Sequence, residues 1–344
     1  MEKVMVAMSG GLDSTAAAIL LMEQGCYVEG ATFRLFDDNE AVKRAAEVCA
    51  KLEIRHHIVE LEGAFSAQVV APFVAGYVNG ITPNPCVMCN KTIKFGAFFD
   101  WAMGQGADAV STGHYARVGR VDGRFRLMRA DDPKKDQSYV LYTLSAERLP
   151  KLHFPLEGLT KDAVRAIVAG AGIEIQAGES QDICFIPDGD YGAFLAGQGA
   201  DSLPGDFVDA AGHLLGRHRG IIHYTVGQRK GLGLSMPEPV YVSGIDAETS
   251  RVCVGDSASL FKTGLTAYDV HLIYPDDLIV PRRVTARIRY NHRGAPAVAT
   301  LLPDGRLSVV FEEPQRAITP GQSVVIYDGD IVLGGGIIAG AMAE

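Results

Sequence analysis

Ser9-Gly10-Gly11-Leu12-Asp13-Ser14 is the stretch of sequence that decides the fold. It follows the apolar run Val4–Met8, which is typical of a strand, and it leads into the run Thr15–Gln24, which is typical of a helix. A glycine turn between a strand and a helix forms an anion site, because backbone N–H groups and the positive end of the helix converge on a phosphate. Glycines let the backbone approach closely, and Asp13 can orient a metal ion or a hydrogen-bond donor. We therefore expect a nucleotide as the ligand.

This loop differs from the two common phosphate loops, since it has neither a Gly-Lys-Ser/Thr ending nor the spacing Gly-x-Gly-x-x-Gly. It resembles the pyrophosphate loop of enzymes that cleave ATP between the α and β phosphates and form adenylated intermediates. The resemblance implies that the loop holds the departing pyrophosphate while an acceptor oxygen takes the AMP. The alternative is a turn of small residues that only joins a strand to a helix.

Length, composition and charge limit the class of protein. A chain of 344 residues predicts two or three domains, and 47% apolar with 21% charged residues is typical of a globular enzyme. The sequence shows no secretion signal and no long apolar stretch, so we expect a cytoplasmic protein that does not enter membranes. The formal net charge of −9 argues against a general, charge-driven nucleic-acid binder, yet it allows a local basic surface at a shaped site.

Up to about residue 112 the chain alternates short β-rich runs with helical periods, which predicts a parallel sheet covered by helices. The expected strands are Lys3–Met8, Tyr27–Arg34, Arg55–Glu60 and Asp108–Thr112, and the expected helices are Asp13–Gln24, Glu40–Leu52, Ala64–Asn79 and Lys91–Gly104. Ligands of such sheets bind beyond the carboxyl ends of the strands. The loops Ser9–Ser14, Phe33–Asp38 and Gly113-His114 should therefore meet at one crevice.

After about residue 112 the pattern of predicted secondary structure changes. Phe125–Met128 predicts a strand, and Gln137–Gly172 predicts two helices broken at Pro150 and Pro155. After the loop at 180–190, short β-rich runs with glycine and proline predict a small β module and then an antiparallel β-barrel. The expected strands there are Val240–Asp246, Arg251–Gly255, Val284–Tyr290, Ala297–Leu302, Leu307–Phe311, Ser323–Tyr327 and Ile331–Ala339.

The fold class that these patterns predict is α/β at the N-terminus and all-β at the C-terminus. We expect a nucleotide-binding catalytic domain over residues 1–195, with a helical part at about 135–175. A small central β module should occupy residues 196–262, and the antiparallel barrel should occupy residues 263–344.

Three of the six cysteines lie beside proline and polar residues rather than in apolar patterns: Cys86, Cys89 and Cys184. In a long chain without an export signal these thiols should be reduced. Lys91 and Lys94, together with the positive end of a helix beginning near Lys91, would lower the pKa of the Cys89 thiol. A reactive pair of Cys89 and Cys184 is therefore expected, provided that the fold brings the two together.

Six separated motifs follow the order found in one family of pyrophosphate-loop ATPases, of the adenine-nucleotide α-hydrolase type. They are Ser9–Ser14, Asn84–Phe95, Thr112–Arg117, Lys135–Tyr139, Ser180–Phe185 and Gly227–Leu232. The chain resembles the tRNA-specific 2-thiouridylases nearly from end to end. The resemblance implies transfer of sulfur to C2 of the wobble uridine of tRNA.

The resemblance also implies a reaction in two steps. ATP, with Mg²⁺ screening its phosphates, would adenylate O2 of the uridine, because C2 accepts a nucleophile only once its oxygen can leave. A persulfide on Cys184 would then attack C2 and expel AMP, and Cys89 would free the sulfur by forming a disulfide with Cys184 or by assisting proton transfer. The sulfur would come from a sulfur-relay donor protein or a cysteine desulfurase, and the enzyme would be a monomer.

Site residues of the family carry over to the matching positions of this chain. The residues expected to bind ATP are Ala7, Met8, Ser9, Gly10, Gly11, Leu12, Asp13, Ser14, Phe33 and Gly113. The residues expected to contact tRNA are Asn84, Pro85, Cys86, His114, Lys135, Asp136, Gln137, Arg289, Tyr290 and Gln322. The segment Asn84–Cys86 should meet the target base, and the last three residues give the predicted barrel a role in holding tRNA.

The sequence departs from the family pattern at Cys86, where an aspartate is usual. A cysteine at this position can bind metal as a thiolate. Cys86, Cys89 and Cys184 could therefore hold three irons of a [4Fe–4S] cluster whose fourth iron carries inorganic sulfide, and no persulfide on Cys184 would then be needed. Zinc on Cys86 and Cys89 is a further alternative, although a structural zinc site requires four ligands.

Two other classes of function stay open at the level of sequence. A pyrophosphate-loop enzyme that adenylates a carboxylate or carbonyl for amidation would need no cysteines. A non-catalytic protein that binds RNA or senses through an iron–sulfur cluster would consume no ATP. For single segments the simplest interpretations are a satisfied histidine pair in a strand for His56-His57 and a solvated loop for Lys135–Gln137.

Overall fold

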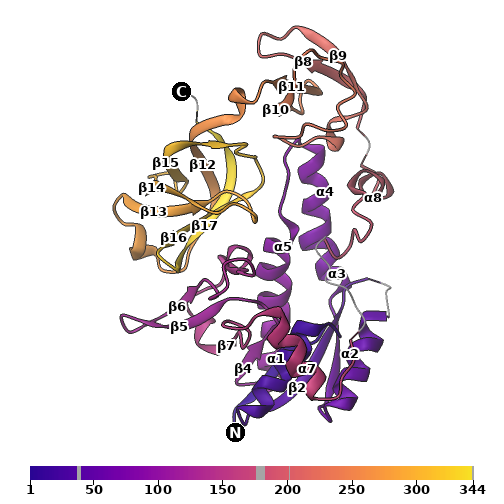
Figure 1. Ribbon diagram of the computed structural model, residues 1–344, viewed down its shortest axis with the longest axis vertical. Coiled ribbons are helices and arrows are strands. Elements are labelled where there is room, and N and C mark those ends of the chain that lie inside the picture. The colour runs from indigo at the N-terminus through magenta and orange to yellow at the C-terminus, as the bar shows by residue number, and fades with distance from the viewer. Residues whose placement is uncertain (37–39, 176–182, 201, 343–344) are drawn as a thin grey trace. The chain divides into compact units, whose positions relative to one another are not determined.

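The computed structural model describes residues 1–36, 40–175, 183–200 and 202–342. The chain divides into two compact units (Figure 1). The first unit comprises Met1–Val69, Cys86–Glu179 and Asp330–Val332. The second unit comprises Val70–Pro85, Ser180–Gly329 and Leu333–Glu344.

A sheet of five parallel strands forms the centre of the first unit, in the order β3-β2-β1-β4-β7. Its strands are β1 (Lys3–Ala7), β2 (Tyr27–Arg34), β3 (His56–Glu60), β4 (Ala109–Ser111) and β7 (Leu152–His153). Val4 of β1 lies opposite Val28 on one side and opposite Ala109 on the other. The strand order therefore reverses at β1, and parallel sheets bind ligands beyond the carboxyl ends of the strands at such a point. The predicted parallel α/β fold is confirmed.

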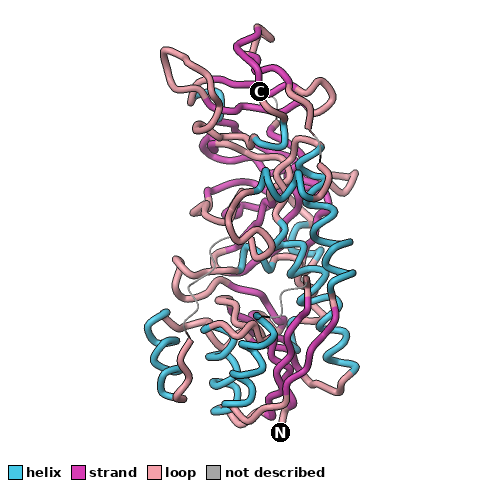
Figure 2. Tube along the Cα trace, turned by 90° about the vertical axis from the view of Figure 1, so that its right-hand side faces the viewer, coloured by secondary structure: helices cyan, strands magenta, loops and turns pink. Residues whose placement is uncertain are grey.

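Helices cover both faces of this sheet, as Figure 2 shows. The helices of one face are α1 (Leu12–Glu23), α2 (Glu40–Lys51) and α7 (Lys161–Gly170). Ala16–Ala18 of α1 are fully buried in a core shared with Val4, because side chains of one methyl group let the helix pack closely on the strands. On the other face, the ring centroids of Phe33 in β2 and Phe98 lie 4.7 Å apart.

Residues 85–104 form one continuous helix on that second face. Its parts are α5 (Pro85–Met88), the π-helix η2 (Cys89–Ala97) and α6 (Phe98–Gly104). The prediction that this helix begins at Lys91 is wrong, because Pro85 opens it. Proline has a fixed φ and no N–H group, so it suits the first turn of a helix.

The predicted pair of helices over Gln137–Gly172 is also wrong. The structure has two 3₁₀ turns, the short strand β7 and the single helix α7. Leu152 pairs with Val110, so this part of the chain returns to the sheet as an edge strand. Further elements between residues 62 and 151 are α3 (Glu62–Phe65), the π-helix η1 (Ser66–Val70), β5 (Arg117–Val121), β6 (Arg124–Met128), η3 (Ser138–Leu141) and η4 (Leu149–Lys151).

The second unit begins with helices and a small sheet. Helices α4 (Ala71–Val78) and α8 (Tyr191–Gly197) share an aromatic core in which Phe73 contacts Phe185, with centroids 5.4 Å apart. The four strands, in the order β10-β11-β8-β9, are β8 (Gly205–Val208), β9 (Leu214–His218), β10 (Tyr241–Asp246) and β11 (Arg251–Gly255). The short 3₁₀ helices of this unit are η5 (Ile221–His223), η6 (Ala258–Leu260) and η7 (Pro275–Leu278).

Six antiparallel strands close into the predicted barrel, because β12 pairs with both β15 and β17. They are β12 (Phe261–Leu272), β13 (Arg282–Arg287), β14 (Ala295–Leu301), β15 (Leu307–Arg316), β16 (Ser323–Asp328) and β17 (Ile331–Ala341). The sequence does not predict β12, since a shift of register between Tyr268 and His271 breaks its alternation. The domain boundaries after residues 195 and 262 stay a prediction. Within the described ranges, no helix has both the length and the apolar character needed to cross a bilayer.

Candidate active site

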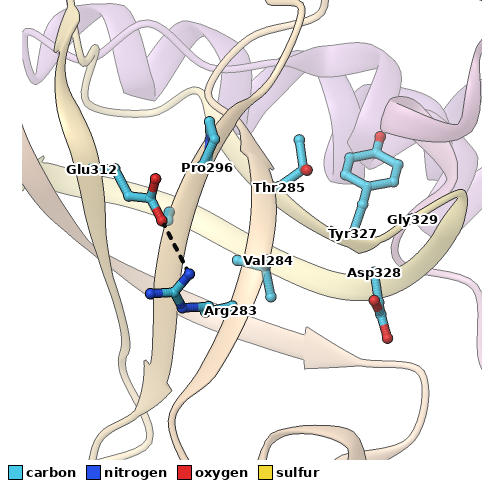
Figure 3. A pocket seen from close by; sticks show the side chains of 9 residues that line it. Arg283, Val284, Thr285, Pro296, Glu312, Tyr327, Asp328 and Gly329 are labelled. Atoms are coloured by element: carbon cyan, nitrogen blue, oxygen red, sulfur yellow. Dashed lines mark ion pairs between the residues drawn. The ribbon is translucent and has the colours of Figure 1, made fainter.

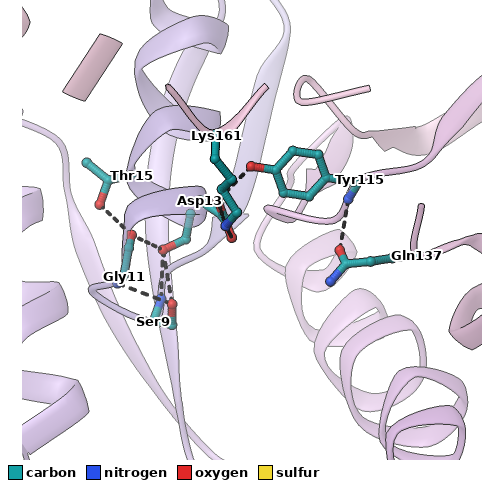
Figure 4. A network of polar contacts seen from close by, with 8 residues as sticks. Ser9, Gly11, Asp13, Thr15, Tyr115, Gln137 and Lys161 are labelled. Carbon is teal, nitrogen blue, oxygen red and sulfur yellow. Dashed lines mark hydrogen bonds and ion pairs between the residues drawn. The ribbon is translucent and has the colours of Figure 1, made fainter. Parts of the chain in front are cut away.

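The loop Ser9–Gly11 connects β1 to α1 and is tied to the first turn of the helix (Figure 4). The Ser9 N–H group donates to Ser14 Oγ at 3.2 Å, and the Gly11 N–H group donates to Ser9 Oγ at 3.3 Å. Ser14 Oγ in turn donates to the Gly11 carbonyl at 3.1 Å. Gly11 is the N-cap residue of α1, and no side chain caps the helix. The geometry is that of an anion site, since the first N–H groups of a helix require an acceptor from outside.

Two glycines allow neighbouring backbones to approach this loop. Gly10 has φ +71°, and a Cβ atom there would lie 2.7 Å from Arg44 Cβ of α2. Gly113 follows β4, and a Cβ atom there would lie 2.7 Å from the carbonyl carbon of Asp13. The loops after β1 and β4 therefore touch, as the sequence predicts. Of the third expected loop, residues 37 and 38 lie outside the described residues.

Three side chains from distant parts of the chain meet at the start of α1 (Figure 4). Lys161 Nζ, at the first residue of α7, lies 2.8 Å from both carboxylate oxygens of Asp13. The Tyr115 hydroxyl donates to Asp13 Oδ1 at 2.9 Å, and Lys161 Nζ lies 5.2 Å from the centre of the Tyr115 ring. Lys161 and Tyr115 are absent from the residues predicted from sequence, although Tyr115 stands within the motif Thr112–Arg117.

The segment Lys135–Gln137 holds the backbone of Tyr115 through hydrogen bonds from Gln137. Gln137 Oε1 accepts from the Tyr115 N–H group at 2.9 Å, and the Gln137 N–H group donates to the Tyr115 carbonyl at 2.8 Å. Asp136 is buried, and its Oδ1 atom accepts from the N–H groups of Ala130 and Ser138. These contacts give Asp136 and Gln137 internal roles, and their predicted contact with tRNA stays a prediction, as does that of the half-buried Lys135.

The remaining residues predicted to bind ATP flank the loop. Ala7 ends β1, and the buried Met8 donates its N–H group to the Ala31 carbonyl at 2.8 Å. Phe33 stands near the end of β2 and is half-buried. These positions agree with a nucleotide lying along the carboxyl edge of the sheet, which remains a prediction for each residue.

Cys86 and Cys89 lie in the first turns of the helix over 85–104, rather than in front of it as the sequence predicts. Cys89 is buried and Cys86 is exposed to solvent. The protein that surrounds Cys86 nevertheless raises the pKa of its thiol, and the nearby positive charge of Lys94 opposes this rise.

His114 is a buried residue between the sheet and this helix. Its Nδ1 atom lies 2.6 Å from Thr112 Oγ1, and its ring contacts the rings of Phe95 and Phe154. Burial holds the pKa of His114 well below 6.5, and the charge of Lys94 lowers it further. A neutral imidazole cannot form an ion pair with a phosphate, so a contact of His114 with tRNA would have to be a hydrogen bond.

Several predicted tRNA contacts lie in the second unit. Gln322 Nε2 donates to the Thr82 carbonyl at 2.9 Å, and the Thr82 N–H group donates to the Pro320 carbonyl at 2.9 Å. The barrel thus holds the segment that leads into Asn84 and Pro85. Arg289 Nη1 donates to the Arg316 carbonyl at 3.1 Å, and Tyr290 follows it with 38% of its surface exposed.

Cys184 is exposed, and its neighbours Ile183 and Phe185 pack against the aromatic core of α4 and α8. The preceding residues of its motif, Ser180–Asp182, lie outside the described residues. In the described part of the chain, no three His, Cys, Asp or Glu side chains are grouped closely enough to hold a metal ion. Cys86 and Cys89 belong to the first unit and Cys184 belongs to the second.

A hollow of about 260 Å³ on the barrel contains none of the predicted site residues (Figure 3). It is lined by Arg283, Val284, Thr285, Pro296, Ala297, Glu312, Tyr327, Asp328 and Gly329. Arg283 Nη1 and Glu312 Oε1 are 3.9 Å apart there, and both side chains are more than half exposed. An exposed ion pair of this kind is no mark of a catalytic site.

Family models match three consecutive parts of the chain. Residues 2–188 match the model described as a tRNA methyl transferase HUP domain, residues 192–256 match a tRNA methyl transferase PRC-barrel domain, and residues 262–338 match an aminomethyltransferase β-barrel domain. The protein named tRNA-specific 2-thiouridylase MnmA of Desulforudis audaxviator is 46% identical over 346 residues, covering 99% of this chain and 100% of the relative. That of Clostridium botulinum strain Alaska E43 is 43% identical over 352 residues, with 98% of each chain covered.

The chain belongs to the tRNA-specific 2-thiouridylase family. A solved structure described as a 4-thiouridine synthetase–RNA complex with bound ATP is 20% identical, covers 50% of this chain and 41% of that chain, and has a TM-score of 0.35. Within this fold, the loop Ser9–Ser14 is the part suited to hold the phosphates of a nucleotide.

Proposed function

We propose that this protein transfers sulfur to C2 of the wobble uridine of tRNA and uses ATP to activate O2 of that base. The observation that carries the proposal is the uncapped start of α1 beneath Gly113, with Lys161 and Tyr115 fixed on Asp13. Full-length identity of 43–46% to proteins named 2-thiouridylases supports the same reaction. Methyl transfer, which the family descriptions name, requires neither a phosphate loop nor reactive cysteines.

In the first step, O2 of the uridine attacks the α-phosphorus of ATP and pyrophosphate leaves, while the N3 proton is released. The N–H groups at the start of α1 hold the phosphates, and Lys161 supplies a positive charge beside them. Gly113 keeps the loop after β4 in contact with the loop after β1. Asp13 offers carboxylate oxygens of the kind that Mg²⁺ takes as ligands, and the ion would neutralise phosphate charge when bound.

In the second step, the outer sulfur of a Cys184 persulfide attacks C2, and the C2–O2 bond breaks as AMP leaves. The Cys89 thiolate then attacks Sγ of Cys184 and breaks the S–S bond to the transferred sulfur, so that the sulfur stays on C2 and N3 regains a proton. The products are 2-thiouridine and a disulfide between Cys89 and Cys184, which an external dithiol reduces for the next cycle. A persulfide-carrying protein, either a relay donor or a cysteine desulfurase, reloads Cys184 on an enzyme that we propose to be monomeric.

The alternative is that Cys86, Cys89 and Cys184 carry inorganic sulfide on an iron–sulfur cluster. It is motivated by a cysteine at position 86, and it requires the three thiols to come together. Anaerobic purification separates the two versions. A brown protein whose iron and visible absorption are lost in Cys86→Ala would support the cluster, whereas a colourless protein that is active with a persulfide donor would exclude it.

The experiment for the main proposal uses unmodified tRNA, ATP, Mg²⁺ and a sulfur donor, with 2-thiouridine measured by mass spectrometry. We expect the wild type to form it, and we expect Cys89→Ser and Cys184→Ser to form none while still releasing pyrophosphate when tRNA is present. Cys253→Ser, a half-buried cysteine of β11, is the matched control and should keep full activity. Absence of 2-thiouridine under both aerobic persulfide and anaerobic sulfide conditions would refute the proposal.

Two rival functions give different results in the same assay. An amidation enzyme would form no 2-thiouridine, and its ATP-dependent release of pyrophosphate with its own substrate would be unchanged in Cys89→Ser and Cys184→Ser. A non-catalytic RNA-binding protein would bind tRNA and release no pyrophosphate.

A further inference from the structure

The motif Gly227–Leu232 has no role in the reaction described above, yet the structure builds it as a rigid loop. The Gly227 N–H group donates to the Val242 carbonyl at 2.8 Å, and the Val242 N–H group donates to the Gln228 carbonyl at 2.9 Å. The loop is thereby fixed to strand β10. At its other end Leu232 is buried in the core of the small sheet, with 7% of its surface exposed.

The Gln228 side chain holds the interior of this loop. Its Oε1 atom accepts from the Thr225 N–H group at 3.0 Å, and its Nε2 atom donates to the Lys230 carbonyl at 3.0 Å. Both ends of the loop and its centre are therefore fixed, while Arg229 and Lys230 between them are exposed. Cations on a preorganised loop lose less conformational entropy on binding an anion than cations on a mobile segment do.

The loop lies against the barrel part of the same unit. A Cβ atom on Gly227, which has φ +90°, would lie 2.9 Å from Ala317 Cβ. The neighbouring Arg316 has its guanidinium carbon 5.0 Å from the centre of the Tyr241 ring, and its carbonyl accepts from Arg289 Nη1 at 3.1 Å. Arg289 is one of the predicted tRNA contacts. Gly227, two residues before Arg229, thus approaches Ala317, and Arg289 donates to the carbonyl of Arg316 beside it. We call Arg229, Lys230, Arg316 and Arg289 the cationic strip.

The same loop is also tied to the segment that precedes the predicted base contacts. The Thr82 hydroxyl donates to Thr225 Oγ1 at 3.2 Å, two residues before Gly227, and Gln322 holds the Thr82 carbonyl. Asn84 follows two residues after Thr82. Within one unit, hydrogen bonds link Thr225, just before this loop, to the segment that leads into Asn84 and, through Thr82, to Gln322. The approach of Gly227 to Ala317 places the loop beside Arg316, which accepts from Arg289.

Charge decides which kind of partner fits the strip. A protein with a net charge of −9 repels a polyanion on average, so its affinity for RNA has to come from local groups of cations. Glu238 is the acidic residue that lines the same hollow as Arg229. Arginine binds phosphate through two parallel N–H groups, and lysine binds it as a point charge.

We propose that the cationic strip Arg229, Lys230, Arg316 and Arg289 binds the phosphate backbone of tRNA. The inference rests on the proposed function and adds a phosphate contact surface to it. Backbone contacts fix the register of the substrate without reading its bases, so the strip should act equally on all tRNAs that the enzyme accepts.

The test compares the double variant R229A/K230A with the control R251A/R306A. The control also removes two exposed arginines from the second unit, but they lie beside Asp246 and Asp304 and outside the strip. Binding of unmodified tRNA is measured from about 50 to 200 mM salt. Loss of two phosphate contacts should reduce the slope of log Kobs against log salt by about 2. The KM for tRNA should rise while the KM for ATP stays constant.

The variant R229K/K230R keeps both positive charges and should bind tRNA as the wild type does, whereas the charge-reversed variant R229E/K230E should bind more weakly than the alanine variant. Equal slopes for R229A/K230A and R251A/R306A would overturn the inference, and so would weak binding by R229K/K230R at an unchanged melting temperature. If the wild type binds and thiolates tRNA while these variants match the control, only the strip is refuted. If the wild type neither binds nor thiolates tRNA, the proposed function itself fails.

Discussion

Asp13 would by itself repel the phosphates of a nucleotide, because its carboxylate stands at the start of the helix that should hold them. Lys161 removes this conflict, since its ammonium group lies 2.8 Å from both carboxylate oxygens. Tyr115 adds a hydrogen bond to the same carboxylate. The net charge that ATP meets at the loop is therefore set by a pair of residues that are 148 positions apart in the sequence.

We predict that Lys161→Met raises the KM for ATP by about 10- to 100-fold, which corresponds to about 1.4–2.7 kcal/mol. The physical reason is that Asp13 keeps its negative charge beside the phosphates once the ammonium group is gone. Initial rates of pyrophosphate release at saturating tRNA, measured over a range of ATP concentrations, give the KM and kcat separately.

Lys161→Arg keeps the charge and should keep most of the affinity for ATP. If neutralisation of Asp13 is the role of Lys161, the loss caused by Lys161→Met should be much smaller in an Asp13→Asn background. Equal losses in both backgrounds would instead mean that Lys161 acts on the phosphates directly.

At the scale of elements, the sequence predicts what is local and periodic. The alternation of apolar runs and turns gives β1, α1, β2 and α2 to within one or two residues. It fails over 137–172, where Leu149, Leu152 and Leu156 have a helical spacing but enter the core from short turns and an edge strand. Tertiary burial, not propensity, decides that segment.

The site residues likewise fall into those that the local sequence predicts and those that only tertiary packing brings to the site. The loop Ser9–Ser14 is visible in the sequence because one short segment supplies the strand end, the turn and the helix start. Lys161 is not visible, since only the packing of α7 against α1 brings it to Asp13. The buried position of Asp136 is likewise a property of the fold, although its motif identifies it as a functional candidate.

The histidine pair of β3 shows how neighbouring strands satisfy polar side chains inside the sheet. His56 Nε2 lies 2.8 Å from Thr32 Oγ1, and His57 Nε2 lies 2.6 Å from Glu29 Oε2. Lys3 Nζ lies 3.2 Å from the other Glu29 oxygen. The interpretation of His56-His57 as a satisfied pair therefore holds, and Glu29 is the buried charge that the arrangement stabilises.

We predict that Glu29 makes the first unit sensitive to acid. Burial raises the pKa of Glu29, but the hydrogen bonds from His57 and Lys3 outweigh it and bring the pKa below the ordinary value of 4.5. A carboxyl group with a lowered pKa contributes stability that is present above 4.5 and is lost as the pH falls through the folded value. The free energy of unfolding should therefore differ between wild type and Glu29→Gln by about 2 kcal/mol at pH 7, and by less below pH 4.

Urea unfolding of the two proteins at several pH values measures this difference. Lys3→Met should show a smaller loss of the same sign, because it removes one of the two partners of Glu29. A difference between wild type and Glu29→Gln that stays constant from pH 7 to pH 3 would contradict the assignment.

At the scale of the whole molecule, the residues proposed to act in the reaction are distributed over both units. The first unit contains the phosphate loop, Cys86 and Cys89, and the second contains Cys184, the cationic strip and the barrel. Each unit has its own hydrophobic core. A chain with separate cores need not unfold in one step, and a ligand stabilises the part that binds it.

We predict that calorimetry resolves two unfolding transitions and that ATP raises only the transition of the first unit. ATP at about 100 times its Kd adds about 2.7 kcal/mol to a unit that binds it, which raises the melting temperature by roughly 5–10 °C for a unit of this size. Lys161→Met should abolish most of this shift, whereas the strip variant R229A/K230A should keep it. A single transition, or an equal shift of both transitions with ATP alone, would show that the division of ligands between the units is wrong.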